Sequence, residues 1–541
     1  MRKRKAIFAG AAGLGCAFCF AAGRRLDVDY SLQLTEKGFY LEWLLWGILL
    51  GGILYGIWTA AEKCGKTGLP TGRFVQKAAA FEGKIRWWMI VLFLLVMWTP
   101  VWLSLFPGAF SYDAYDEWKQ VQTGAITSHH PVLHVLLLGG LTEGVYQLTG
   151  SYNGGIALYV FLQMVLLALT FAYAVHFLRE RAVAPVLRLF AILFFACSPV
   201  VQLFSICGTK DILFGAAFLL FVISLFRVCT DRERFFANKG WQVLFCVSAL
   251  LSMILRKNGF YAAILTLLIL VPLCSRNWKR YLGLFLVILA VYGLYVGPFY
   301  GALQVIPGGK QEMLSVPLQQ LARVHRYERS VFSPEELEYL YRLVPEKHWE
   351  QYRSTVADFV KSGFQQAVYE EDPGAFWTLW ACTGVKKPLT YLNSFLIGTV
   401  DYWYPFAIVD GYQGPEEKSS FFDYRVAPPG EERVFLTGLH DIYERISWDK
   451  EAQKKPGMFL LLSPGWYFLL YALLVCYVWY RRLYRRLVPL VAIALYFCTL
   501  LLGPIALVRY VLILYYVLPI YSVFLPEPER NACLIREKEV K

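Results

Sequence analysis

The segment FPGAFSYDAYDEWKQVQTGAITSHHPVLH carries an unusual density of ionisable side chains for a largely apolar chain. Asp113, Asp116 and Glu117 stand at positions i, i+3 and i+4, so a helix would place them on one face. His130 and His134 have the same i, i+4 spacing. A carboxylate beside an incoming hydroxyl can act as a general base, and an imidazole can donate a hydrogen bond to a phosphate.

Zinc is the other chemistry that a pair of histidines four residues apart would suit. No HExxH motif occurs, and no cysteine stands near His130 and His134. The sequence therefore predicts no metal ligand. A divalent cation is compatible with the acidic residues, but the predicted chemistry requires no cofactor.

Other charged residues open later apolar runs. Lys210 and Asp211 occur in CGTKDILFGAAFLL, Arg256 and Lys257 in LRKNGF, and Arg509 in GPIALVRYVLIL. Ionisable groups at the ends of spans cost less than groups at the bilayer centre, so each one alone is explained by a solvated helix terminus. If all of these ends face the same side of the membrane, they form one site together with Asp113, His129 and His130.

The composition requires a membrane to position these residues. The chain has 541 residues, of which 57% are hydrophobic and 17% charged, and its mean hydropathy is +0.44. The net charge of +13 comes from short clusters such as MRKRK, SRNWKR and YRRLYRRL between apolar runs, as the positive-inside rule predicts. No basic domain stands apart from the runs, so no nucleic-acid partner is expected. The 12 cysteines lie mostly within or beside apolar runs and imply no disulfide framework.

A bilayer core of about 30 Å needs about 20 apolar residues per helix, which predicts an all-α polytopic protein with about twelve transmembrane helices. The predicted spans are approximately 6–22, 40–60, 87–106, 153–177, 186–206, 211–228, 241–256, 259–274, 281–300, 457–480, 486–503 and 506–525. With the N-terminus inside, most of the basic loops also lie inside.

Two segments between the spans decide the topology. Residues 131–148 are predicted to form a helix in the outer interface, started by Pro131 and broken by Gly139, Gly140 and the TGSYNGG turn, because counting it as a span would move RERAVAPVLR outside. Residues 301–456 then form a compact, mainly helical extracytoplasmic domain, in which SPEE marks a helix start capped by Ser333.

The order of SYDAYDEW, HHPVLH and CGTKDILFGAAFLL resembles the GT-C superfamily of integral membrane glycosyltransferases, particularly the protein O-mannosyltransferases and the aminoarabinose transferases. More narrowly, the chain is similar to an uncharacterised family of bacterial multi-pass membrane proteins with SYD and HHP blocks. The resemblance divides the chain into four parts. They are two additional N-terminal spans and a cytoplasmic loop (1–86), a seven-span module with a catalytic outer loop at 107–152 (87–300), the extracytoplasmic domain (301–456), and three spans with a cytoplasmic tail (457–541).

The resemblance also implies a function and a set of site residues. The protein would move a sugar from a polyprenyl-phosphate donor to an extracytoplasmic acceptor (lipid, polymer or protein) at the cell membrane, by metal-independent inverting displacement. Asp113 matches the acidic position for acceptor activation, with Asp116 and Glu117 as fallbacks, and Asp211 matches the second outward carboxylate. The predicted donor-phosphate residues are His129, His130, Lys210, Lys257 and Arg509. The chain departs from the family in having His130 where Lys is commoner, and its outer domain resembles no soluble family.

Two other classes of function stay open on the sequence. A multi-span transporter or lipid flippase would have paired halves, broken helices and charges near the midplane, whereas these charges lie at predicted outer ends and no repeat is evident. A non-catalytic envelope scaffold would bind partners through 301–456, and its outer charges would not need to converge.

Overall fold

The computed structural model describes residues 2–67, 73–111, 113–407, 423–453 and 455–525. Parts of four sequence predictions lie outside these residues: residues 68–72 of the predicted N-terminal cytoplasmic loop, Tyr112 of the SYD motif, residues 408–422 of the predicted outer domain, and the C-terminal tail. The described residues form helices and no strand, with four isolated bridges between loops.

Six helical runs are long and apolar enough to cross a membrane, and a bent pair makes a seventh. The six are α1 (Arg2–Asp29), α2 (Lys37–Thr67), α4 (Trp87–Ser104), α7 (Tyr152–Glu180), α10 (Lys210–Thr230) and a run from α14 (Trp278–Leu294) through a π-turn (Tyr295–Phe299) to α15 (Tyr300–Ala302). In the bent pair, α8 (Pro185–Cys197) and α9 (Pro199–Ser205) meet at 52°. This is the make-up of a polytopic helical membrane protein.

The other predicted spans are also helical but shorter. They are α12 (Lys239–Leu255), α13 (Lys257–Leu273), α26 (Pro464–Tyr480), α27 (Tyr484–Leu500), and a last run of α28 (Leu512–Val517) between two 3₁₀ turns, Val508–Val511 and Leu518–Phe524. The connecting helices in this part of the chain are α3 (Arg73–Glu82), α11 (Arg232–Ala237), α24 (Lys450–Gln453) and α25 (Met458–Leu462).

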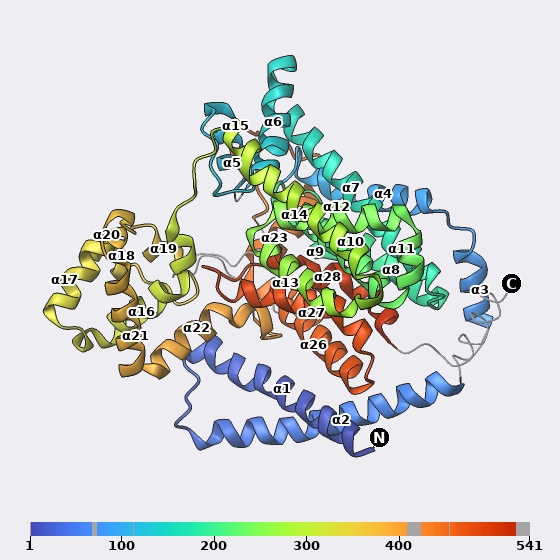
Figure 1. Ribbon diagram of the computed structural model, residues 1–541, viewed down its shortest axis with the longest axis horizontal. Coiled ribbons are helices and arrows are strands. Elements are labelled where there is room, and N and C mark those ends of the chain that lie inside the picture. Colours follow the sequence, from blue (N-terminus) through green and yellow to red (C-terminus); the bar gives the residue numbers. More distant parts are fainter. Residues whose placement is uncertain (1, 68–72, 112, 408–422, 454, 526–541) are drawn as a thin grey trace.

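Helix α10 is the centre of the bundle. It packs against α7, α12, α27 and α28, and 89% of its most apolar stretch is buried. A helix that is apolar all round is typically enclosed by protein in this way. By contrast, only 17% of the corresponding stretch of α2 and 11% of that of α14 are buried, as expected for faces in contact with lipid. Helices α1 and α2 pair as a hairpin along the lower edge of the bundle (Figure 1).

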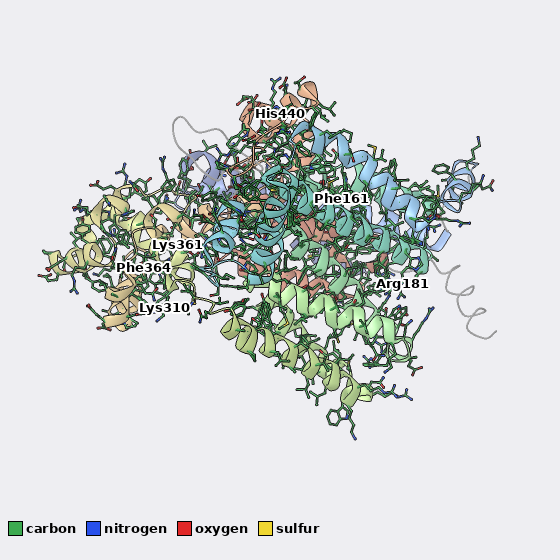
Figure 2. All side chains as sticks on the ribbon, turned by 90° about the horizontal axis from the view of Figure 1, so that it is seen from above. Phe161, Arg181, Lys310, Lys361, Phe364 and His440 are labelled. Atoms are coloured by element: carbon green, nitrogen blue, oxygen red, sulfur yellow. The ribbon has the colours of Figure 1, made fainter. Side chains whose placement is uncertain are left out.

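A separate helical unit with its own hydrophobic core stands to one side of the bundle (Figures 1 and 2). Its helices are α16 (Ser315–Glu328), α17 (Pro334–Leu343), α18 (Glu346–Glu350), α19 (Asp358–Lys361), α20 (Gln366–Glu371) and α21 (Pro373–Lys386). The start of α17 is as predicted: Ser333 accepts a hydrogen bond from the backbone of Glu336, whose side chain accepts one in return from the backbone of Ser333.

This unit is smaller than the predicted domain of residues 301–456. Its core ends at Tyr391, within α22 (Pro388–Trp403). The second half of α22 and the following α23 (Thr437–Trp448) contribute to the core of the bundle, through Ile397, Val400 and Tyr443. The predicted segment therefore combines a unit with its own core and two helices that pack on the bundle.

The site loop folds as two short helices, α5 (Ala114–Thr123) and α6 (Val132–Thr149), and α6 packs against both α5 and α7. Helix α6 follows Pro131 as predicted and is not among the span candidates. The prediction that Gly139 and Gly140 break it is wrong, because α6 continues through both. The predicted break at the TGSYNGG turn is confirmed, since α6 ends at Gly150 in the left-handed conformation (φ +70°). A Cβ at Gly139 would lie 2.6 Å from Val121 and 3.0 Å from the backbone oxygen of Glu117. The absence of a side chain at Gly139 therefore permits the close packing of α5 on α6.

Candidate active site

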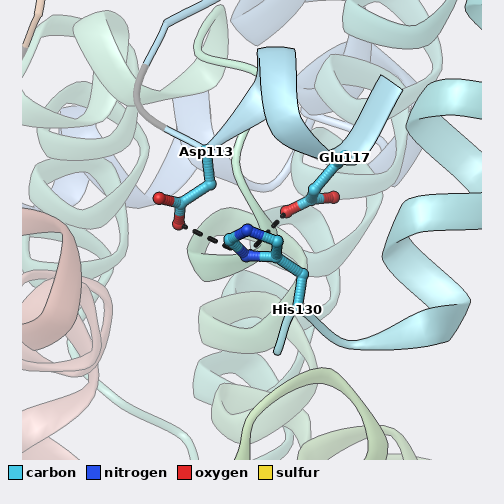
Figure 3. Close-up of side chains that lie close together, drawn as sticks. All are labelled: Asp113, Glu117 and His130. Atoms are coloured by element: carbon cyan, nitrogen blue, oxygen red, sulfur yellow. Dashed lines mark ion pairs between the residues drawn. The ribbon is translucent and has the colours of Figure 1, made fainter. Parts of the chain in front are cut away.

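The three acidic residues of the loop, predicted to share one helical face, do not all point the same way in the structure. Asp113, immediately before the helix, and Glu117, one turn later, point toward His130 from two sides (Figure 3). The side chain of Glu117 is completely buried, and that of Asp113 is 26% exposed. Asp116 is exposed and lies outside this group. The i, i+4 pair therefore faces the bundle, and the residue beside Glu117 faces solvent.

Lys210 and Arg509 bring positive charge to Asp113. Lys210, the first residue of α10, donates a short hydrogen bond to Asp113 Oδ2, and its Nζ lies 3.2 Å from His130 Nδ1. Arg509 Nη1 lies 3.1 Å from the same Asp113 oxygen. One carboxylate oxygen is thus shared by two cations that are far apart in the sequence.

Asp211 is shared in the same manner. Arg256, which caps α13, donates a short hydrogen bond to Asp211 Oδ1, and its guanidinium carbon lies 4.2 Å from the centre of the Tyr510 ring. Arg509 Nη1 lies 3.7 Å from Asp211 Oδ2 and donates to Thr209 Oγ1 at 3.4 Å. Arg509 therefore joins the two carboxylates into one charged cluster.

The remaining predicted residues, His129 and Lys257, lie at the edge of this cluster. His129 is exposed, and its ring is edge-on to that of His130 with centroids 4.6 Å apart. Lys257 is exposed at the start of α13 and makes no hydrogen bond or ion pair with the described residues. A Cβ placed on Gly308 would lie 3.3 Å from the backbone nitrogen of His129 and 3.6 Å from Lys257 Nζ, so the two residues flank the same loop.

The electrostatic environment acts differently on the three titratable groups of the loop. Burial raises the pKa of Asp113, but Arg509 and Lys210 outweigh it and hold this pKa well below its ordinary value. Burial, followed by the charge of Lys210, lowers the pKa of His130 from 6.5 to about 4, so His130 is neutral at pH 7. Burial and the charge of Asp113 raise the pKa of Asp116. Asp113 is therefore a firmly ionised carboxylate and a weak base.

Glu117 and His134 form a buried pair in the site that the sequence did not predict. His134 Nδ1 forms a short hydrogen bond with Glu117 Oε2, and both side chains are fully buried. His134 Nε2 lies 2.7 Å from the hydroxyl of Tyr159 on α7. The i, i+4 spacing from His130 was the available signal for His134, but nothing in the sequence pairs it with Glu117.

Three of the site residues have the donor atoms of a metal site. One ligand atom each from Asp113, Glu117 and His130 lie within 4.8 Å of one another. A hard divalent cation would suit two carboxylates and an imidazole. The ammonium of Lys210, however, already hydrogen-bonds Asp113 and His130 and lies 4.0 Å from Glu117 Oε1. The charge that a metal would supply there is thus provided by the chain itself.

Comparison with known proteins assigns the chain to a family. Residues 118–534 match the model of a family of unknown function, DUF6020, and the protein belongs to that family. The match includes Glu117's hydrogen-bond partner His134 and the cations Lys210, Arg256 and Arg509, and it begins just after Asp113 and Glu117. No curated protein and no solved structure matches the chain.

Proposed function

We propose that the protein is a membrane glycosyltransferase that transfers a sugar from a polyprenyl-phosphate donor to an acceptor hydroxyl on the extracytoplasmic side. The proposal includes a GT-C-like bundle of about twelve spans, in which the shorter helices complete the six or seven long ones. The cell membrane is the proposed location. A lipid, a polymer or a protein of the envelope would be the acceptor.

The observation that carries the proposal is the meeting of Lys210, Arg256 and Arg509 with Asp113 and Asp211. These residues come from three apolar helices and one loop that are far apart in the sequence, and they converge on one charged cluster. Preorganised cations aimed at an oxygen that gains charge are usually the largest contribution to catalysis of group transfer. The leaving phosphate of a polyprenyl-phosphate sugar is such a group.

The chemistry needs three things from the chain. Lys210 and Arg509 would bind the phosphate, with His130 as a neutral hydrogen-bonding partner and with Lys257 and His129 at the edge. Asp211 would hold Arg256 and Arg509 in place. A carboxylate of the loop would take the proton of the acceptor, as the sequence predicts for Asp113. Direct displacement by this route inverts the anomeric carbon and requires neither a metal nor a redox cofactor.

The experiment is a comparison of lipid-linked sugars in wild-type cells and in cells that lack the gene. We expect a polyprenyl-phosphate sugar to accumulate when the protein is absent. The purified protein, supplied with an envelope extract that contains the acceptor, should release free polyprenyl phosphate from that lipid. An unchanged lipid-linked pool would contradict the proposal. Accumulation in cells without release by the purified protein would indicate a flippase instead.

A further inference from the structure

Behind the charged cluster runs a hydrogen-bonded chain of four buried side chains: Glu117, His134, Tyr159 and Gln163. Its inner end is fixed by the backbone. Gln163 Nε2 donates to the backbone oxygens of Ser205 and Cys207, at 3.0 and 2.9 Å. Because carbonyl oxygens only accept, the amide cannot be turned round, and Gln163 Oε1 must face Tyr159 as an acceptor.

The orientation of Gln163 determines where the protons of the chain lie. The Tyr159 hydroxyl donates its single proton to Gln163 Oε1 at 3.0 Å, so the Tyr159 oxygen can only accept from His134 Nε2. His134 Nε2 therefore carries a proton. The short contact between His134 Nδ1 and Glu117 Oε2 holds a second proton, since two bare acceptors would repel each other.

The Glu117–His134 pair is consequently neutral as a unit. Either a carboxylate faces an imidazolium or a carboxylic acid faces a neutral imidazole, and the net charge is zero in both cases. The cluster in front of the pair has three cations, Lys210, Arg256 and Arg509, and two carboxylates, Asp113 and Asp211. These five side chains thus carry an excess of one positive charge, which an anionic ligand would balance.

Glu117 keeps one oxygen available for chemistry. Its Oε1 is buried and has no hydrogen-bond partner among the described residues. It lies 3.9 Å from His130 Nδ1 and 4.0 Å from Lys210 Nζ. An unpartnered buried acceptor is costly, and here it faces the place that the Lys210 ammonium now occupies. A phosphate that draws Lys210 toward itself would leave this place to a hydroxyl donor.

Resting on the proposed function, we propose that Glu117, rather than Asp113, takes the proton of the acceptor hydroxyl, with His134 as its positioning residue. The acceptor O–H bond breaks and its proton goes to Glu117 Oε1. The acceptor oxygen bonds to the anomeric carbon, and the bond from that carbon to the phosphate oxygen breaks, so that the lipid phosphate leaves as an anion. If the pair starts as a carboxylic acid and a neutral imidazole, the proton on Glu117 Oε2 moves to His134 Nδ1 at the same time. Both starting forms of the pair therefore end as a protonated Glu117 beside a His134 imidazolium.

Asp113 is poorly placed to accept a proton. Its Oδ2 accepts from both Lys210 and Arg509, and these charges keep it ionised. Protonation of Asp113 would leave two cations without their shared anion, whereas protonation of Glu117 leaves one, the His134 imidazolium, whose Nδ1 still donates to Glu117 Oε2. Asp113 is accordingly the counter-ion that holds the two cations until the donor phosphate arrives.

The neutrality of the pair is tested with inorganic phosphate and the purified full-length protein in detergent. Asp113→Asn removes one negative charge beside Lys210 and should tighten phosphate binding about tenfold, whereas Glu117→Gln leaves the pair neutral and should leave binding unchanged. His134→Gln can donate to Glu117 but cannot hold the extra proton, so it should weaken binding. Equal tightening by Asp113→Asn and Glu117→Gln would mean that Glu117 is a lone anion, and the inference would be wrong.

The proton-acceptor role is tested in the deletion strain by the amount of lipid-linked sugar that remains. Glu117→Gln should lower transfer by about 10²–10⁴-fold with unchanged phosphate binding, and Asp113→Asn should lower it less. Glu143→Gln on α6 is the matched control and should behave like the wild type. If Glu117→Gln does not accumulate in cells, Tyr159→Phe tests the same chain, since it removes the acceptor of the His134 Nε2 proton and should slow transfer without weakening phosphate binding.

The outcomes separate the inference from the function on which it rests. Normal transfer by folded Glu117→Gln, or by Tyr159→Phe in its place, would overturn the inference and leave the glycosyltransferase standing. A deletion strain with an unchanged lipid-linked pool, or a protein that binds no phosphate in any of these forms, would overturn the proposed function itself.

Discussion

The two ends of α10 carry similar residues and serve different purposes. At the C-terminal end, Arg227 pairs with Glu180 at 2.5 Å, donates to the hydroxyl of Tyr173, and lies 4.3 Å from the centre of the Trp241 ring. At the N-terminal end, Lys210 and Asp211 belong to a cluster in which each carboxylate serves two cations. Both ends are charged groups at the edge of a buried apolar helix.

The difference lies in the balance of charge. The single cation Arg227 is matched by one carboxylate, Glu180, and is covered by aromatic rings. The other end has three cations for the two carboxylates Asp113 and Asp211. A single charged residue at a span end is therefore not evidence of a site. A cluster of such residues in which cations outnumber carboxylates is evidence of one.

The largest test of this comparison is the side of the membrane on which each end of α10 lies. The topology predicts that the unit around α16 to α21 is extracytoplasmic, on the same side as Lys210. Cys382 on α21 is exposed and free, so an impermeant maleimide should label it in intact cells and should not label Cys382→Ser there. Protection of Cys382 until the cells are permeabilised would invert the scheme.

Removing one arginine from each end should separate catalysis from stability. Arg509→Gln should lower transfer by about 10²–10³-fold, because the phosphate loses a preorganised cation, while Lys210 and Arg256 still pair with Asp113 and Asp211. Arg227→Gln should lower the free energy of unfolding by about 2–3 kcal/mol and leave transfer per folded molecule unchanged. Transfer assays and denaturant unfolding in detergent measure the two effects. Equal losses of activity would make the ends equivalent.

His130 should make folding stability depend on pH. Its pKa is about 4 in the folded protein and 6.5 without the surroundings of the site, so the unfolded chain binds more protons between these values. Stability from this group is complete above pH 6.5 and is lost as the pH falls toward 4. Between pH 7.5 and 5.0 the wild type should lose about 2 kcal/mol more than His130→Gln. His325 has the same shift and the same sign, and it cancels in the difference between the two proteins.

The smallest expected effect concerns Lys257, at the edge of the cluster. Lys257 is exposed and makes no ion pair with the described residues. It can therefore attract the donor phosphate only at long range across solvent, where salt screens the interaction. Lys257→Met should raise the KM for the lipid donor about three- to fivefold at low salt with kcat unchanged, and the effect should fade as salt is added. A loss of kcat would place Lys257 in the inner cluster.

The sequence alone located the apolar helices of the bundle. Each of the twelve predicted spans is helical among the described residues, because a long apolar run in a membrane protein must satisfy its backbone hydrogen bonds internally. It also located the start of α17 at Ser333 and that of α6 after Pro131, because capping side chains and proline act on their immediate neighbours. The predicted site residues Asp113, His130, Lys210, Asp211 and Arg509 do come together in the structure.

Only the tertiary structure decided which neighbouring residue enters the site. Glu117 is buried and Asp116 exposed, although the helical spacing allows both to share a face with Asp113. The rotation of α5 about its axis is set by its close packing on α6 at Gly139, a contact across 22 residues that no local pattern encodes. The proton shared by Glu117 and His134 depends in turn on Gln163 and on two backbone oxygens of another segment. Local composition fixes a helix, but the partners of a buried polar group are fixed by whatever the fold brings against it.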